Sequence, residues 1–329
     1  MIVQFLHTGG EHSISKRQMK AGNFTKDWNC GDHLRKYLHA KGAYIEDGKI
    51  IGNEDKWEDI YFWGEWEPQS KVTPIENQKP GAYPHFIHEP FLKLNESGQL
   101  IKGDKNSTPT NTDPFVFGEK GFYYSYCMQS IKTLQKLDPG SIILFGSTIK
   151  RNTPDAYFAL DTVFVVGQKE NKLKYNIKKD LSELEEFAPT YYLDIMNYKS
   201  SENNPKCSCS KRKSEGCEKE EEDYTCYRGA SYDNPIKCGD DDKKKMYSFV
   251  PCKIGSEGEK GFERVKLTKD SFNQIYKEAI ISNNKAQGVN YTKTNNIQDN
   301  FKIWTKLCEI IEKYGCYEAV KLNYTEKNI

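Results

Sequence analysis

Two apolar stretches near the middle of the chain decide the fold: Ile142-Ile143-Leu144-Phe145-Gly146 and Phe158-Ala159-Leu160-Asp161-Thr162-Val163-Phe164-Val165-Val166. Their β-branched and aromatic residues favour strands, and the polar segment between them favours a reversal of the chain. We therefore predict an antiparallel pair of strands at the centre of the fold. Asp161 interrupts the second stretch, and a buried carboxylate at that position needs a charged or hydrogen-bonding partner.

The elements on either side of this pair do not alternate regularly between strand and helix. Further strands are predicted at 2–6, before the turn Thr8-Gly9-Gly10, and at 60–66, where aromatic residues are dense. Helices are predicted from caps and apolar spacing at 33–38, 181–198, 271–282 and 298–314. This order predicts an α+β protein with a mixed or mainly antiparallel central sheet and flanking helices.

Composition divides the chain into three parts. Between residues 200 and 246 aliphatic residues almost vanish, and Cys residues stand among runs of Lys, Arg, Glu and Asp. We interpret this segment as a Cys-rich polar insertion. An N-terminal core that carries the candidate pocket then spans 1–199, and a strand and helices at 247–329 complete that core.

Charge and hydropathy exclude several classes of protein. The 48 Lys and Arg against 47 Asp and Glu leave a net charge of +1, which gives no chain-wide attraction to nucleic acid or anionic lipid. No stretch approaches the roughly 20 apolar residues of a membrane-spanning helix, and the first residues lack the pattern of a signal peptide. We therefore expect a cytoplasmic protein with no membrane partner and with reduced or metal-bound thiols. The sequence does not indicate an oligomeric state.

All six His lie within the first 88 residues. His7 ends the first strand and His12 follows the Gly-Gly turn, and polar side chains tend to converge at such strand ends. An imidazole near a carboxylate suits general acid–base catalysis, and an Arg can bind phosphate through two hydrogen bonds. The pattern predicts His12 as a catalytic residue and Arg35 as a phosphate ligand. The alternative is that these are ordinary turn and surface residues.

A second candidate is the stretch Trp63-Gly64-Glu65-Trp66-Glu67-Pro68. Trp63 and Trp66 can stack on a planar base, and Glu65 can accept a hydrogen bond from an exocyclic amine. The stretch therefore predicts a substrate-binding surface. Aromatic strands also commonly pack in a core, and this alternative stays open.

A third candidate runs from Asn111-Thr112-Asp113-Pro114 into the aromatic segment that begins at Tyr123. Here Asp113 is predicted to handle protons, while Asn111, Tyr124 and Gln129 hold the substrate. The alternative is that Asn111 and Asp113 only hydrogen-bond the backbone in a turn before Pro114.

The insertion carries a possible metal site. Four thiols in a C-x-C-x7-C-x8-C pattern can close a tetrahedral zinc site, and this segment has too few aliphatic residues to form its own core. The predicted ligands of this structural zinc are Cys207, Cys209, Cys217 and Cys226. The alternatives are a disordered loop that carries free thiols and a catalytic instead of a structural zinc.

The stretch Leu137-Asp138-Pro139-Gly140-Ser141-Ile142-Ile143-Leu144-Phe145-Gly146, with the N-terminal strand, the Gly-Gly turn and the aromatic middle, resembles uncharacterised nucleotide-modification-associated domains of bacteria and phages. It also resembles a step in the barrels of the pseudouridine-synthase-associated superfamily, which bind modified bases or RNA. The resemblance covers about residues 115–166 and carries over no catalytic residue.

Two functions follow from the residues and this resemblance. The first is binding or modifying a nucleotide or a nucleic-acid base, in bacterial DNA modification or phage conflict, as the resemblance implies. The second is a non-enzymatic interaction module whose zinc-stapled insertion contacts a partner. The absence of a P-loop, a dinucleotide fingerprint, a nucleophile elbow and a kinase signature disfavours other large enzyme classes.

Overall fold

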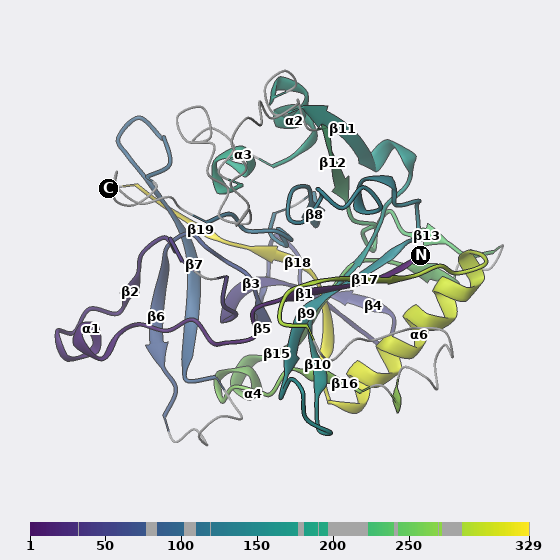
Figure 1. The fold of residues 1–329 in the computed structure, drawn as a ribbon. Coiled ribbons are helices and arrows are strands. Elements are labelled where there is room, and N and C mark those ends of the chain that lie inside the picture. The colour runs from purple at the N-terminus through teal and green to yellow at the C-terminus, as the bar shows by residue number, and fades with distance from the viewer. Residues whose placement is uncertain are drawn as a thin grey trace, which may run out of the picture.

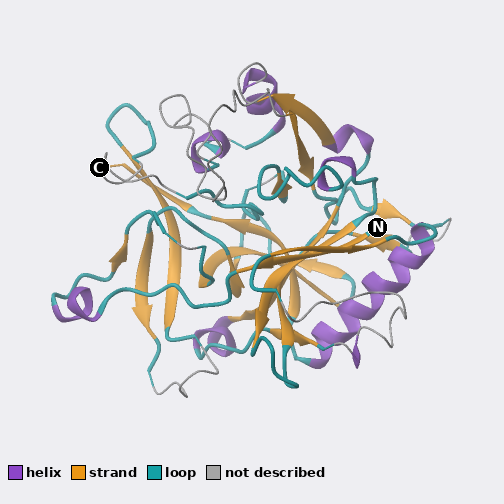
Figure 2. Ribbon diagram, in the orientation of Figure 1, coloured by secondary structure: helices purple, strands orange, loops and turns teal. Residues whose placement is uncertain are grey.

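The computed structural model describes the chain except for residues 32, 77–83, 102–109, 119, 177–180, 190, 197–222, 240–242, 269, 272–284 and 329. Strands fill most of the described part, and helices lie at its periphery (Figure 2). The prediction of an α+β protein is therefore wrong, and the fold is mainly β. Of the described helices, only α6 (Ile297–Lys313) is long, with 17 residues.

The predicted central pair of strands is confirmed. β9 (Ile142–Ile149) and β10 (Tyr157–Val165) pair antiparallel, with Ile143 opposite Phe164. β1 (Ile2–His7) lies parallel to β9 on its other side, and the outer strands are β16 (Val265–Leu267) and β17 (Gly288–Thr292). The five strands cross the middle of the molecule in the order β16-β10-β9-β1-β17 (Figure 1).

A second sheet curls into a small closed ring of four strands. β3 (Lys36–Glu46) pairs with β5 (Glu58–Gly64), β5 with β15 (Val250–Ile254), β15 with β18 (Tyr317–Asn323), and β18 again with β3. Strands from both ends of the chain therefore share one sheet. Outside the ring the sheet continues through β7 (Phe86–Leu94), β6 (Ser70–Pro74) and β2 (Thr25–Lys26), with β4 (Lys49–Ile51) and β19 (Thr325–Asn328) at its margins.

The helix predicted at 33–38 is instead the start of β3. Tyr37 and Leu38 are fully buried on opposite faces of the strand, and each joins a different hydrophobic cluster. A helix this short cannot bury two opposite faces, whereas a strand between β5 and β7 does so while its backbone is hydrogen-bonded on both sides. Long-range pairing therefore overrides the local helix signals.

The remaining elements cover the two sheets. A three-stranded sheet of β11 (Lys172–Asn176), β12 (Asp223–Arg228) and β8 (Tyr123–Tyr124) lies beside α2 (Leu181–Phe187) and α3 (Tyr192–Ile195), which replace the single helix predicted at 181–198 (Figure 1). The helix predicted at 298–314 is confirmed as α6, whose Trp304 donates a hydrogen bond to the Tyr247 carbonyl at 3.0 Å. The helix predicted at 271–282 lies almost wholly outside the described residues. Short elements complete the chain: α1 (Lys16–Lys20), α4 (Gly255–Glu259), β13 (Ile236–Lys237) and β14 (Lys245–Met246).

Candidate functional site

Strand pairing brings charged residues from distant parts of the sequence to one place. In the antiparallel register of β3 and β5, Lys36 lies opposite Gly64, so the residues before Lys36 run beside those after Gly64. The chain that leaves β1 pairs with the same segment, since the Arg35 N–H donates to the Gly10 carbonyl at 2.8 Å and the His12 N–H to the Arg35 carbonyl at 2.7 Å. The ends of β1, β3 and β5 therefore meet.

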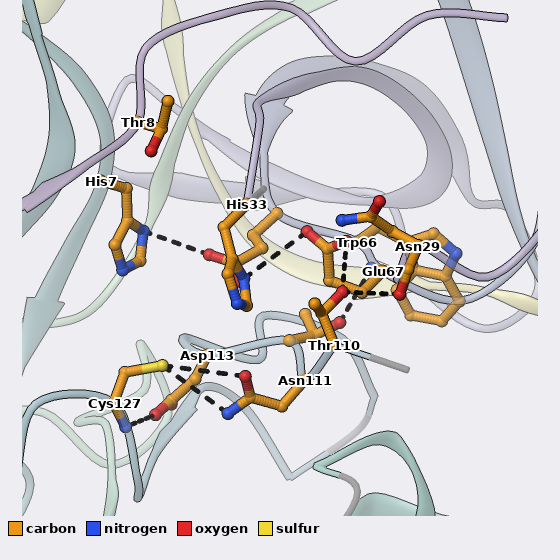
Figure 3. A network of polar contacts seen from close by, with 12 residues as sticks. His7, Thr8, Asn29, His33, Trp66, Glu67, Thr110, Asn111, Asp113 and Cys127 are labelled. Atoms are coloured by element: carbon orange, nitrogen blue, oxygen red, sulfur yellow. Dashed lines mark hydrogen bonds and ion pairs between the residues drawn. The ribbon is translucent and has the colours of Figure 1, made fainter. Parts of the chain in front are cut away.

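The residues assembled at this junction form what we call the His–Glu cluster: His7, His33, Arg35, Glu65 and Glu67. Figure 3 shows His7, His33 and Glu67 facing a common region from separate chain segments. Four of the five residues are buried, and the His33 side chain keeps 27% of its surface exposed. Solvent or a ligand therefore reaches the cluster at His33.

Glu65 is the centre of the cluster. Its Oε2 lies 3.0 Å from Arg35 NH2 and 3.1 Å from His7 Nδ1, and its Oε1 lies 2.8 Å from His33 Nδ1. Burial alone would raise the pKa of the Glu65 carboxyl, but the positive charges around it hold this pKa well below its usual value. Glu65 is therefore ionised.

The two histidines of the cluster have opposite protonation preferences. Burial tends to lower the pKa of His33, but its hydrogen bond to Glu65 and the negative charges of Glu65 and Glu67 raise this pKa to about 9. Burial lowers the pKa of His7 despite the opposing charge of Glu65. At neutral pH, His33 is therefore a cation and His7 is neutral.

Glu67 is only half satisfied. Its Oε2 accepts a hydrogen bond from Thr110 Oγ1 at 2.9 Å, and its backbone N–H donates to Thr112 Oγ1 at 3.0 Å. Its Oε1 is buried, lies 3.8 Å from His33 Nδ1, and makes no hydrogen bond. The segment 110–112 thus fixes the side chain with one oxygen aimed at His33.

Asp161 joins the cluster through two arginines. A β-bulge interrupts the pairing of β10 with β9 between Leu160 and Thr162, and such bulges redirect a side chain. Asp161 Oδ1 lies 3.3 Å from Arg264 NH1, and its Oδ2 lies 3.9 Å from Arg35 NH1. Arg264 also donates to Ser147 Oγ at 3.1 Å and to the Gly9 carbonyl at 2.9 Å. The expected need of Asp161 for a charged partner is met here.

Asp113 holds the neighbouring loop. Its carboxylate accepts hydrogen bonds from the backbone N–H groups of Ser125, Tyr126 and Cys127 at 3.2, 2.8 and 2.7 Å. Burial raises its pKa to about 7, and the negative charge of Glu65 contributes to this rise. The amide of Asn111 donates to Cys127 Sγ at 3.6 Å, and Figure 3 shows both side chains on the side of His33 where Asp113 lies.

His12 lies in a different polar group from the His–Glu cluster. Its carbonyl accepts a hydrogen bond from His88 Nε2 at 2.9 Å, and His88 Nδ1 is 2.9 Å from Ser70 Oγ. Burial and the nearby charge of Lys36 lower the pKa of His12 to about 2, so it is neutral in its folded environment. The structure gives no contact between His12 and Asp113 among the residues it describes.

The other predicted ligand residues are engaged within the protein. The Arg35 guanidinium is buried against Glu65 and Asp161, so its charge is already balanced and is not presented to a phosphate. Trp63 and Trp66 are buried in opposite hydrophobic clusters, where their indole N–H groups donate to the Phe262 and Gln69 carbonyls. Neither ring therefore presents an open face for stacking.

The side chains of Tyr124 and Gln129 form hydrogen bonds with backbone groups of the protein. The Tyr124 hydroxyl donates to the Cys127 carbonyl at 2.8 Å, and the Gln129 amide exchanges two hydrogen bonds with the backbone of Thr225 at 2.7 and 2.8 Å. Both side chains therefore support the loop that carries Cys127.

Of the four predicted zinc ligands, three lie outside the described residues: Cys207, Cys209 and Cys217. Cys226 is part of β12, where its buried thiol faces the Tyr192 hydroxyl at 3.8 Å, and burial raises the pKa of this thiol. A thiol held inside a sheet in this way is poorly placed to join ligands in the polar insertion.

Two members of the assembled site were not singled out by the sequence reasoning: Glu67 and Arg264. A signal for Glu67 is present, because Glu65 and Glu67 are two residues apart and so share a face in extended chain. Arg264 has no such signal, since it reaches Asp161 from more than 100 residues away.

No family model, curated protein or solved structure matches this chain. Among the residues that the structure describes, no helix is long and apolar enough to cross a membrane.

Proposed function

We propose that this protein is an enzyme that binds a nucleobase, free or within a nucleoside or nucleic acid, and transfers protons to or from it at the His–Glu cluster. The observation that carries the proposal is the arrangement of three buried carboxylates, the buried Arg35 and the largely covered Arg264 side chain around a partly exposed imidazole, His33. Such an arrangement is typical of a reaction centre, where buried charges shift the pKa values of neighbouring groups.

Stability alone does not explain the cluster. Buried ion pairs are often no better than well-packed apolar residues of the same volume, because each charge loses its hydration. Glu67 adds to this cost, since one of its buried carboxylate oxygens has no hydrogen bond. A fold that needed only a core would be more stable with an apolar residue at this position.

The charge balance favours a neutral ring over a phosphate. Arg35 and Arg264 are balanced by Glu65 and Asp161, and the cation of His33 faces Glu65 and Glu67. Lys36 is buried and donates to the Trp66 carbonyl. The one cation in excess of the three carboxylates is Lys36, which is buried, so the cluster presents no accessible surplus of positive charge to a phosphate. The phosphate role predicted for Arg35 is therefore not part of this proposal.

The groups at the open side suit a base. His33 in its protonated form donates a hydrogen bond or a proton. The Asn111 amide has long contacts with Cys127 Sγ through its nitrogen at 3.6 Å and its oxygen at 3.9 Å, and its second N–H and second oxygen lone pair lie in one plane, as the edge of a base requires. In this proposal His33 is the acid that faces the ring, the charge of Glu67 raises the pKa of His33, and Asn111 hydrogen-bonds to the edge of the ring.

Calorimetric titration with the four common nucleosides and their 5′-monophosphates tests this proposal. We expect at least one nucleoside to bind more tightly than its monophosphate, and Asn111→Ala to weaken that binding about 10-fold, the loss of roughly one hydrogen-bond pair. His85→Ala, at an exposed histidine whose Nδ1 lies 2.6 Å from Glu11, is the matched control and should bind as the wild type does. Tighter binding of the monophosphates, no nucleoside binding, or no effect of Asn111→Ala contradicts the proposal.

A further inference from the structure

We propose that His33, Glu65 and Glu67 form a binding site for one divalent transition-metal ion. One ligand atom from each residue lies within 4.8 Å of the others, and His33 Nδ1 is 2.8 Å from Glu65 Oε1 and 3.8 Å from Glu67 Oε1. Ligands at about 2.0–2.2 Å from one ion are separated by roughly 3–3.5 Å, so small side-chain shifts suffice to close the site.

The second oxygen of each carboxylate is held by a neighbour. Glu65 Oε2 is engaged by Arg35 NH2 at 3.0 Å and by His7 Nδ1 at 3.1 Å, and Glu67 Oε2 accepts from Thr110 Oγ1 at 2.9 Å. Outer partners of this kind orient ligands in metal sites. They leave Glu65 Oε1 and Glu67 Oε1 directed at the same point as His33 Nδ1.

An independent observation is the unsatisfied oxygen of Glu67. Glu67 is fully buried, yet its Oε1 has no hydrogen-bond partner. A buried carboxylate oxygen without a partner is expensive, and an ion coordinated at this point supplies the missing interaction. The ion pair of this oxygen with His33 spans 3.8 Å, which is too long for a hydrogen bond, so the pairing does not satisfy the oxygen.

The ligand set indicates the kind of ion. One imidazole and two carboxylates suit Mn²⁺, Fe²⁺ or Zn²⁺, whereas Ca²⁺ prefers oxygen ligands alone. Three protein ligands, of which the imidazole is partly exposed, leave coordination positions open, as in catalytic rather than structural sites. This site shares no ligand with the cysteines from which a structural zinc was predicted.

The inference concerns the same cluster as the nucleobase proposal but does not depend on it. When bound, the ion supplies a Lewis acid and replaces the proton at His33 Nδ1, so the protonated His33 of the nucleobase proposal belongs to the metal-free protein. Metal binding and nucleoside binding are measured separately, so one can fail while the other holds.

Titration of the full-length protein with Mn²⁺, followed by the electron paramagnetic resonance signal of the free ion, tests the inference. Mn²⁺ is the appropriate probe because thiolates, which bind Zn²⁺, have little affinity for it. We expect one Mn²⁺ per chain in the wild type and in His85→Ala, and at least 10-fold weaker binding in Glu67→Gln and in His33→Asn. Circular dichroism and thermal melting verify that these variants fold.

Two results would overturn the inference. One is the absence of stoichiometric Mn²⁺ binding to the wild-type protein at millimolar concentration. The other is unchanged affinity in folded Glu67→Gln or His33→Asn, which would place the ion elsewhere.

Discussion

The two glutamates of the His–Glu cluster should differ sharply in what they contribute to folding. Glu65→Gln removes the charge that faces Arg35 at 3.0 Å, His33 at 2.8 Å and His7 at 3.1 Å. Arg35 then loses its close carboxylate partner and keeps Asp161, whose Oδ2 is 3.9 Å from its Nη1, and the His33 carbonyl at 3.3 Å. Breaking a buried ion pair costs about 3–5 kcal/mol, so we expect a loss of that size in the free energy of unfolding.

Glu67→Gln should leave stability nearly unchanged. An amide oxygen in place of Oε2 keeps the hydrogen bond from Thr110, and the group that changes is the oxygen that has no hydrogen bond in the folded protein. The lost attractions are that to His33 across 3.8 Å and that to the charge of the buried Lys36, and the removal of a buried carboxylate charge offsets them. We expect a change within about 1 kcal/mol.

Urea unfolding at pH 7, followed by tryptophan fluorescence, measures both changes from the midpoints and slopes. Glu89→Gln, at an exposed pair with Lys71, is the control for loss of a surface charge and should cost less than about 0.5 kcal/mol. Equal losses for Glu65→Gln and Glu67→Gln, or a loss below about 1 kcal/mol for Glu65→Gln, would refute the division of the cluster into a structural and a functional carboxylate.

Two further predictions concern the loop at Asp113 and the closure of the ring. Burial raises the folded-state pKa of Asp113 from 3.8 to about 7. The protonated side chain therefore contributes to the free energy of unfolding in full below pH 4, and roughly 4 kcal/mol of this stabilisation is lost as the pH rises to 7. Asp113→Asn should remove this part of the pH dependence in urea unfolding between pH 4 and 8, and an unaltered slope would be the contrary result. Gly42→Ala places a Cβ 2.1 Å from the Lys321 carbonyl oxygen, so β3 and β18 must separate; we expect a loss of about 1–3 kcal/mol, measured by the same unfolding assay. In the control Gly31→Ala the added Cβ lies 3.7 Å from its nearest atom. A comparable loss of stability in this control would show that the loss in Gly42→Ala does not come from the contact with Lys321.

Local signals were sufficient for the elements that bury one continuous apolar run. β1, the pair of β9 and β10, and α6 all follow from apolar spacing and flanking turns, because their neighbours only reinforce what the local sequence already favours. A helix is predicted at 33–38 because Asp32 is a suitable N-cap residue and Gly42 a suitable stop, whereas the chain from Lys36 to Glu46 forms β3. Its strand form depends on β5 and β18, and β18 begins 271 residues after the end of β3.

The site was predictable only in its parts. His7 is a candidate because it ends a predicted strand, Arg35 as a phosphate ligand and Glu65 as an acceptor for an exocyclic amine, whereas His33 lies at the start of a predicted helix. These residues come together because of the register that sets Lys36 opposite Gly64 and the pairing of Gly10 with Arg35. No local sequence pattern predicts either pairing. For the same reason the sequence could not show that Arg35 forms an ion pair with Glu65, or that Trp63 and Trp66 pack in different hydrophobic clusters.

The central claim is that the His–Glu cluster meets a ligand at His33, and nuclear magnetic resonance of the imidazole side chains tests it most directly. Protein labelled with ¹⁵N at its six histidines is titrated with nucleosides, and the His33 signals are assigned from the His33→Asn variant. We predict that the His33 signals shift while those of His39, which pairs with Asp59 at 2.8 Å, stay in place. Unmoved His33 signals at millimolar nucleoside, or equal shifts of His33 and His39, would contradict the claim.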